Sequence, residues 1–283
     1  MGVLCLALGV LLIHISTNSY EFNKYNVGWN GTSQFFDSLD RQKVTEIDDP
    51  SELMGYTNTS LLVISPTRIF TSQDLDYYYT YVSKGNTLIL ADNVGTGSNL
   101  LSGMGSSIRI QNGTLSSMDR AYNNQYMIVA YSADPVRMPL GDTGVVFNKA
   151  AAVRGGDPLI TTSHLSWRVT PGARSPGYSV SLTQYPVAAY ETLGQGDVYV
   201  VGDPNIFINS MQSPGTGYAN GQFIQALLGT HENLLVDTYS TGIEQPAGLW
   251  TLIHRIQTNI EYRLGFATLI LLVILISWQK IDV

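Results

Sequence analysis

Two apolar segments, Met1 to Ile15 and Leu264 to Trp278, bracket the chain, and a polar, aromatic-rich sequence lies between them. The second segment carries no charged residue and is flanked by Arg263 and Lys280. As a helix it is roughly 23 Å long at about 1.5 Å per residue, and the flanking basic side chains extend its reach toward the ~30 Å hydrocarbon core of a bilayer. A buried core helix is the alternative for this length, but the aromatic edges and the lack of a polar stripe favour a membrane span.

The first apolar segment lacks the basic residues and the small-residue cleavage site of a secretory signal, so we predict an uncleaved anchor. Its His14 is expected at the membrane interface and not in a proton relay. The expected organisation therefore has three parts. A transmembrane anchor occupies residues 1–17, an α/β domain occupies 18–240, and a juxtamembrane helix over 246–280 continues into a C-terminal transmembrane helix.

Two opposing signals bear on the side of the membrane that the domain faces. Arg255 and Arg263 precede the second span and only Lys280 follows it, which favours a cytoplasmic domain. Glycosylation sequons and 17 tyrosines instead suit an exported surface. The sequons begin at Asn30, Asn58 and Asn112. We give them more weight and predict a two-pass cell-membrane protein whose glycosylated main domain is extracytoplasmic.

Charge and cysteine content exclude several classes of partner and site. The chain has 15 Lys and Arg against 22 Asp and Glu, a net charge of −7. An acidic surface repels phosphate backbones, so nucleic acid is not an expected partner. The single cysteine, Cys5, lies in the first apolar segment, which leaves no intradomain disulfide and no cysteine metal site.

The first half of the central domain alternates between helix and strand patterns. Gln34 to Arg41 places its apolar residues on one helical face, and a second helix follows a cap at Thr71 or Ser72 and ends near Gly85. Leu61 to Ile64 and Thr87 to Ala91 are short, continuously apolar strands. Apolar strands joined by an amphipathic helix predict a parallel sheet that is covered on both faces.

The second half of the domain adds further strands and one helix. We expect strands at Met127 to Tyr131 and Gly144 to Phe147, a long Gly-, Pro- and Ser-rich loop from Arg154 to Pro176, a hairpin of Pro186 to Glu191 with Asp197 to Val201, a helix around Phe223 and a last strand at Leu234 to Val236.

Four stretches carry a resemblance to a known family: YNVGWNGTSQFFDSL, LLVISPTRIFTSQDLDYY, GNTLILADNVGTGSNLL and VYVVGDPNIFINSM. They resemble an uncharacterised family of membrane-anchored archaeal and bacterial proteins over roughly residues 20 to 230. The domain of that family is similar to class I glutamine amidotransferases. The resemblance implies a flavodoxin-like, mostly parallel sheet with helices on both faces, flanked by N- and C-terminal transmembrane helices, and it implies no established reaction.

Amidotransferase chemistry requires a cysteine nucleophile on a strand-to-helix elbow, activated by a histidine paired with a carboxylate. Cys5 cannot supply it, and no G-x-S-x-G elbow offers a serine instead; the nearest match begins at Gly95. The histidines His164, His231 and His254 show no metal-ligand spacing. We therefore predict no amidotransferase activity, no cofactor and no metal.

Polar residues gather where two predicted strands end, and open α/β sheets place ligand crevices at such ends. As candidate ligand-binding residues we select Asp92, Asn93, Thr96, Asp203, Asn205 and Asn209. The competing interpretation is that these side chains bond nearby loop amides and cap turns.

Exposed aromatic residues bear on the kind of partner that the domain could contact. One helix face cannot bury all of the tyrosines between Tyr77 and Tyr81, and exposed Tyr and Trp favour protein or carbohydrate contacts, whereas Trp29 and Trp167 are expected to pack under loops. We expect a non-catalytic module that scaffolds or docks other membrane or envelope proteins and contacts lipid through two transmembrane helices. The alternatives are a small-ligand or glycan sensor that uses the strand-end crevice, and a hydrolase whose nucleophile the sequence does not identify.

Overall fold

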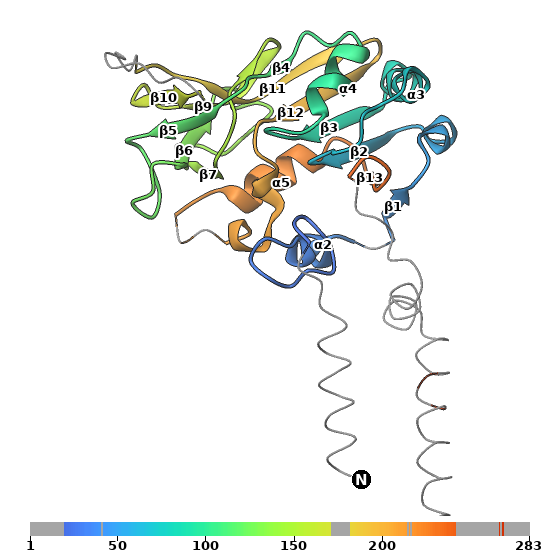
Figure 1. Cartoon of the computed structure of the whole chain (residues 1–283), viewed down its shortest axis with the longest axis horizontal. Helices are drawn as coiled ribbons and strands as arrows, with labels where there is room; N and C mark the ends of the chain where they lie inside the picture. Colours follow the sequence, from blue (N-terminus) through green and yellow to red (C-terminus); the bar gives the residue numbers. More distant parts are fainter. Residues whose placement is uncertain are drawn as a thin grey trace, which may run out of the picture. The chain divides into compact units, whose positions relative to one another are not determined.

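The structure is a computed structural model that describes residues 20–40, 42–170, 182–213, 215 and 217–241, together with 266 and 268. The chain divides into two units, Thr17–Gly242 and a second unit made of Met1–Ser16 and Ile243–Val283. The first unit contains the fold and the candidate site. It is built on a nine-stranded sheet of order β1-β13-β2-β3-β12-β11-β9-β6-β7 (Figure 1).

The strands of this sheet come from every part of the described chain. They are β1 Val44–Ile47, β2 Thr59–Ile64, β3 Thr87–Ala91, β6 Met127–Ser132, β7 Val145–Asn148, β9 Asp157–Thr162, β11 Pro186–Leu193, β12 Gly196–Val201 and β13 Asn233–Asp237. β1 and β13, the first and last strands of the described residues, pair in parallel.

The parallel half of the sheet confirms the strand predictions made from apolar runs. β2 pairs in parallel with β3, with Leu62 opposite Ile89, and β3 pairs in parallel with β12. Leu62, Leu88 and Leu90 are fully buried and Ile64 is 5% exposed. Both faces of these strands are covered, which is why their sequences read as continuously apolar.

The other half of the sheet is antiparallel, and the predicted fold class is corrected here. β12 turns back into β11 through a hairpin, and β11, β9, β6 and β7 then pair antiparallel to one another. The sheet is therefore mixed and carries few helices. A flavodoxin-like or amidotransferase-like, mostly parallel sheet is wrong, because four of the strand pairings in this sheet are antiparallel. The β11–β12 hairpin reverses the strand direction, whereas a parallel neighbour needs a long crossover.

The predicted flanking transmembrane helices and the two-pass cell-membrane localisation are also corrected. Within the residues that the structure describes, no helix has the length and apolar character needed to cross a bilayer. The two apolar segments on which the prediction rested lie outside the described residues, apart from Phe266 and Thr268, and so do Cys5, His14 and His254.

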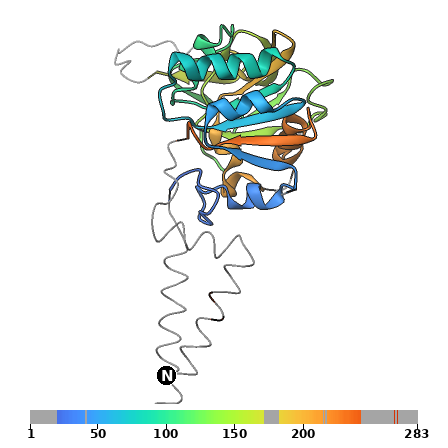
Figure 2. The same ribbon diagram turned by 90° about the vertical axis from the view of Figure 1, so that its right-hand side faces the viewer.

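Helices pack against both faces of the sheet (Figure 2). The described helices are α2 Ser33–Ser38, α3 Ser72–Ser83, α4 Gly97–Gly103, α5 Asn220–Leu228 and the 3-10 helices η1 Pro50–Gly55, η2 Pro204–Phe207 and η3 Asn209–Met211. One buried cluster joins α3 and α4 to the face that bears Leu61 and Leu88. A second cluster joins α2 and α5 to the opposite face, through Phe35 and Phe223.

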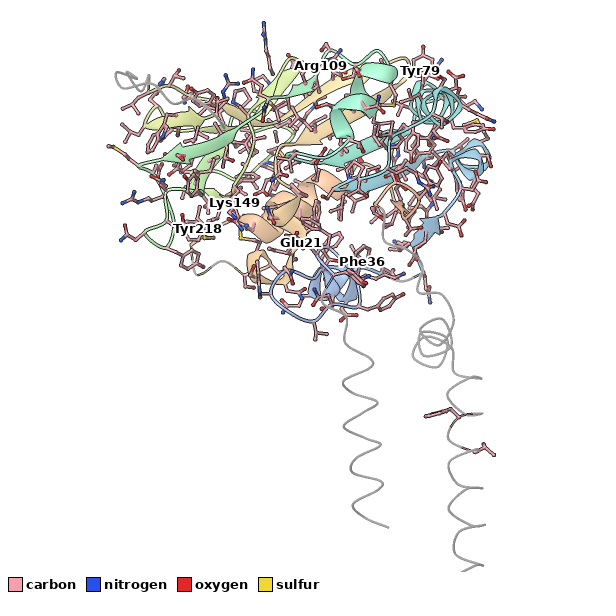
Figure 3. The ribbon with its side chains drawn as sticks, viewed as in Figure 1. Glu21, Phe36, Tyr79, Arg109, Lys149 and Tyr218 are labelled. Carbon is pink, nitrogen blue, oxygen red and sulfur yellow. The ribbon has the colours of Figure 1, made fainter. Side chains whose placement is uncertain are left out.

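The ends of α3 match the sequence prediction. The Thr71 side chain accepts the Asp74 N–H, the Asp74 carboxylate accepts the Thr71 N–H, and Gly85 follows the helix at φ +100°. This capping box satisfies two N–H groups that a helix start leaves unpaired. Tyr78 and Tyr81 are buried, whereas Tyr79 is 45% exposed (Figure 3). α2 is shorter than predicted, and Thr32 makes no side-chain cap hydrogen bond.

The loop predicted from Arg154 to Pro176 is wrong over its first part. β9 and β10 (Ser166–Val169) lie within it, and β10 pairs with β5 (Thr114–Ser117) in a small ribbon. β4 (Arg109–Ile110) and β8 (Val153–Arg154) form a second ribbon. Gly155 and Gly156 lie between β8 and β9, and Pro158 lies near the start of β9, where such residues are compatible with strands. The part of the predicted loop from residue 171 onward lies outside the described residues.

Candidate functional site

Asp92 directly follows β3 and organises the turn that begins there. Its Oδ1 accepts the N–H groups of Asn93 and Gly95, each at 2.8 Å, and its Oδ2 accepts the N–H of Gly97 at 2.8 Å. The side chain is 1% exposed, and burial raises its pKa while these hydrogen bonds oppose the rise. Gly97 is required here because a Cβ would lie 2.6 Å from Asp92 Oδ2.

Thr96 belongs to the same turn but points to a different neighbour. Its hydroxyl donates to the Arg68 carbonyl at 2.7 Å, and its N–H donates to the Pro66 carbonyl at 3.0 Å. The turn is therefore tied to the loop that follows β2. Its backbone is rigid because most of its polar groups are already paired.

Segment 148–152 crosses the carboxyl ends of the parallel strands, where an open crevice was expected. The Asn93 carboxamide donates to the Lys149 carbonyl at 3.3 Å, and the Ala151 N–H donates to the Gly202 carbonyl at 2.7 Å (Lys149, Figure 3). Ala150, Ala151 and Ala152 are each at most 1% exposed. Small alanine side chains let this segment lie directly on the strand ends, so it fills the crevice there.

Asp203 and Asn205 hold the start of that segment. The Asp203 carboxylate accepts the Asn148 N–H and both the backbone and side-chain N–H groups of Asn205, and the Asn205 carboxamide also donates to the Asn148 carbonyl at 2.9 Å. Asp203 is fully buried, and burial raises its pKa to about 7. Both side chains are thus engaged with the protein's own backbone.

Asn209 lies apart from the other candidates and anchors the N-terminal loop, residues 20–32. Its carboxamide donates to the carbonyls of Gly28 at 2.7 Å and Asn26 at 3.0 Å, and its Oδ1 accepts the Gln34 N–H at 2.9 Å. The structure therefore brings Asp92, Asn93, Asp203 and Asn205 together through segment 148–152 and separates Asn209 from them.

The N-terminal loop is also hydrogen-bonded within itself. The Phe22 N–H donates to the Asn30 carbonyl at 3.0 Å, and the Asn26 side chain bonds Tyr20, Gly28 and Asn30. Despite this order, the loop exposes large apolar side chains: Tyr20 is 74%, Val27 67% and Trp29 68% exposed. The expectation that Trp29 packs under a loop is wrong; Trp167 is partly buried.

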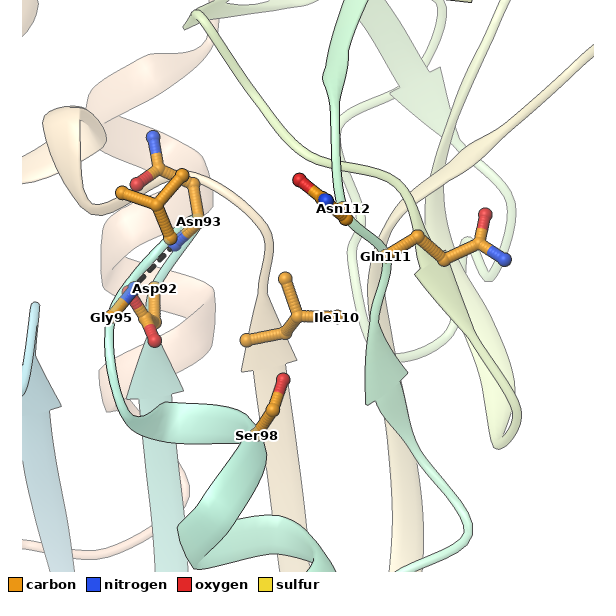
Figure 4. A pocket seen from close by; sticks show the side chains of 8 residues that line it. Asp92, Asn93, Gly95, Ser98, Ile110, Gln111 and Asn112 are labelled. Atoms are coloured by element: carbon orange, nitrogen blue, oxygen red, sulfur yellow. Dashed lines mark hydrogen bonds between the residues drawn. The ribbon is translucent and has the colours of Figure 1, made fainter. Parts of the chain in front are cut away.

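A pocket remains beside the Asp92 turn, with a volume of about 190 Å³ (Figure 4). One wall is the β3–α4 turn and the other is the chain between β4 and β5. Its lining residues are Asp92, Asn93, Val94, Gly95, Ser98, Ile110, Gln111 and Asn112. The sequence did not predict Ser98 and Ile110 as site residues, because no local pattern indicates that β4 lies opposite this turn.

Metal ligands are not gathered in the part of the chain that the structure describes. No set of three or more His, Cys, Asp or Glu side chains there is placed to hold a metal ion. His164 is exposed in the β9–β10 turn, and His231 contacts the Asn58 carboxamide at 3.0 Å. Of the sequon asparagines, Asn30 is hydrogen-bonded to Asn26, and Asn112 is exposed at the pocket.

Comparison with protein families gives one match. The family described as "Domain of unknown function (DUF4350)" matches residues 24–228. The chain belongs to the DUF4350 family. No curated protein matches the sequence.

Solved structures similar to this DUF4350 domain share little sequence with it. The mmIFT52 N-terminal domain has 11% identity and a TM-score of 0.46, over 69% of this chain and 88% of that chain. A cytoplasmic protein from Salmonella typhimurium has 9% identity and a TM-score of 0.33, over 66% of this chain and 76% of that chain. A β-galactosidase from Bacillus circulans sp. alkalophilus has 10% identity and a TM-score of 0.32, over 56% of this chain and 22% of that chain.

Proposed function

We propose that the domain is a non-catalytic module that docks a partner protein through the N-terminal loop. The observation that carries the proposal is Trp29, which stays 68% exposed on a loop whose backbone is bonded to the core. The Ser210 N–H donates to the Trp29 carbonyl at 3.1 Å, and the Asn209 N–H donates to the Gly31 carbonyl at 2.7 Å. A flexible loop could turn such a side chain toward the core at little cost in free energy, whereas the hydrogen bonds of this loop keep it exposed to solvent.

The chemistry of the loop indicates the kind of partner. Trp and Tyr are common energetic anchors of protein interfaces, and a rigid loop loses little conformational entropy on binding. The partner expected is a protein with an apolar pocket for Trp29. A basic rim around that pocket would complement the net charge of −7 and the exposed Glu21, which follows Tyr20 in the loop.

Site-specific photo-crosslinking in the cells that make the protein tests this proposal. A photoreactive phenylalanine derivative replaces Val27 in the full chain, and in a matched control it replaces Val136, which is 88% exposed and lies in the β6–β7 connection. We expect a discrete protein adduct from position 27 and none of that mass from position 136. Adding Trp29→Ser should abolish the adduct, and raised salt before irradiation should weaken it.

Two outcomes would contradict the proposal. One is the same adducts from both positions, which indicates collisions without a specific interface. The other is an adduct from position 27 that persists with Trp29→Ser, although the unfolding midpoint of that variant equals that of the parent chain.

A further inference from the structure

The pocket beside the Asp92 turn carries polar groups that the fold itself does not use. Among the described residues, the Ser98 hydroxyl and the Asn112 carboxamide have no hydrogen-bond partner, and the Asn93 Oδ1 accepts no hydrogen bond. Ser98 is partly buried and Asn112 is exposed, so a ligand that enters the pocket can reach both groups.

The electrostatics of the pocket favour an uncharged ligand. Asp92 is the only charged residue in its lining, and its carboxylate oxygens point to the N–H groups of the turn behind it. The apolar side chains in the lining are Val94, which is 86% exposed, and Ile110, which points toward the turn and faces Ser98 (Figure 4). Neither a cation nor an anion finds a free opposite charge here.

We propose that this pocket binds a neutral sugar residue. Hydroxyl and carboxamide groups both donate and accept hydrogen bonds, as sugar hydroxyls do, and Ile110 offers an apolar surface for the C–H face of a pyranose ring. A volume of about 190 Å³ equals roughly six water molecules at about 30 Å³ each, which suits one ring and not an oligosaccharide. Hydrogen bonds to the Asp92 carboxylate hold the backbone of the turn that carries Asn93, so this part of the pocket is formed before the sugar arrives.

The proposal is independent of docking by the N-terminal loop, because the two sites share no residue. Few contacts form in an open pocket, so we expect a dissociation constant on the order of 1 mM. Loss of two neutral hydrogen bonds should weaken it about tenfold or more.

Saturation-transfer NMR on the full chain tests the pocket with methyl glycosides of glucose, galactose and N-acetylglucosamine as probes. Asn112 heads a sequon, so the chain is produced in a host that does not glycosylate it and the pocket stays free. We expect saturation transfer to at least one glycoside and its loss in the Ser98→Ala, Asn112→Ala double variant. Gln222→Ala is the control, because this carboxamide is exposed in α5 and does not line the pocket.

Each remaining outcome overturns the proposal. No transfer to any of the three glycosides, or equal transfer in the parent and the double variant, excludes a sugar at this pocket. Transfer to an uncharged tripeptide and to none of the glycosides assigns the pocket to peptides instead. Unfolding midpoints of all variants are measured alongside, and the single Ser98→Ala variant replaces the double variant if the latter is unstable.

Discussion

At the scale of single residues, the polar side chains selected from the sequence mainly organise backbone. Asp92 accepts three N–H groups of one turn, and Asp203 and Asn205 hold both polar groups of the Asn148 backbone. Hydrogen bonds to nearby loop amides could be predicted from the sequence, because Asx side chains commonly bond N–H groups a few residues onward. That segment 148–152 would lie over Asp203 was not visible, since it depends on a distant strand.

Replacing Asp92 by Ala leaves three N–H groups of the turn without their acceptor. We expect the free energy of unfolding to fall by about 1–3 kcal/mol, because Gly97 N–H is buried and the other two are only partly reached by water. Urea denaturation followed by circular dichroism measures the change. The control Asp142→Ala, at an exposed position, should stay within about 0.5 kcal/mol of the parent. Equal effects of the two replacements would refute the structural role of Asp92.

Gly31 is the residue that permits the N-terminal loop to close. A Cβ at this position would lie 1.8 Å from the Asn26 carbonyl oxygen, whereas a Cβ at Gly55 would meet nothing within 4 Å. We expect Gly31→Ala to lower the free energy of unfolding by on the order of 3 kcal/mol, and Gly55→Ala to change it by less than about 0.5 kcal/mol. Thermal unfolding of both variants compares them. A Gly31→Ala protein as stable as the Gly55→Ala protein would show that the loop is not packed this tightly.

At the scale of secondary-structure elements, each edge strand of a sheet has backbone N–H and C=O groups that no neighbouring strand pairs. The edge strand β7 is closed by a side chain: Asn220 at the start of α5 accepts the Val146 N–H at 2.9 Å and donates to the Val146 carbonyl at 3.0 Å. A side-chain amide thus replaces the missing neighbouring strand. Exposed edges pair readily with other chains, so this closure protects the sheet from aggregation.

Asn220→Ala should therefore open the β7 edge. We expect a loss of about 1–3 kcal/mol in the free energy of unfolding, because two buried backbone groups lose their partner. More dimer or larger species should appear in light scattering coupled to size-exclusion chromatography. Gln225→Ala, on the exposed side of the same helix, is the control and should leave both measurements unchanged. Unaltered stability with Asn220→Ala would mean that water substitutes fully for the amide.

At the scale of the whole molecule, buried carboxyl groups couple stability to pH. Burial raises the pKa of Asp203 to about 7, and it also raises the pKa values of Asp92 and Asp237. A carboxyl group with a raised pKa binds its proton more tightly in the folded state than in the unfolded chain, where its pKa is about 3.9. Its stabilising contribution is complete below pH 4 and is lost as pH rises toward 7.

The free energy of unfolding should consequently fall between pH 5 and pH 8, as measured by urea denaturation at both values. Burial lowers the pKa of His231, which makes the free energy of unfolding rise with pH. A variant is therefore needed to separate the contribution of Asp203 from that of His231. Asp203→Asn should flatten the fall with pH, whatever its effect on stability at one pH, and the exposed Asp142→Asn should keep it. A parent protein that becomes more stable from pH 5 to pH 8 would contradict the raised carboxyl pKa values.

Local sequence patterns determined those elements that depend only on residues a few positions apart. The apolar runs of β2, β3 and β12, the capping box of α3, the hairpin between β11 and β12, and the amphipathic α5 all follow from residues close together in the chain. Each depends on side-chain period, caps or turn residues, which act over a few positions. The absence of a cysteine nucleophile from the central domain is likewise a property of composition.

Tertiary structure alone decided which elements meet. Nothing local indicates that β1 pairs with β13, that β9, β6 and β7 extend the sheet beyond the β11–β12 hairpin, or that segment 148–152 covers the strand ends. These pairings join residues far apart in sequence, and their free energy comes from burying surfaces that exist only once both partners are folded. The same reason explains the exposure of Trp29, since the side chain that holds its loop outward, Asn209, lies at the other end of the domain's sequence.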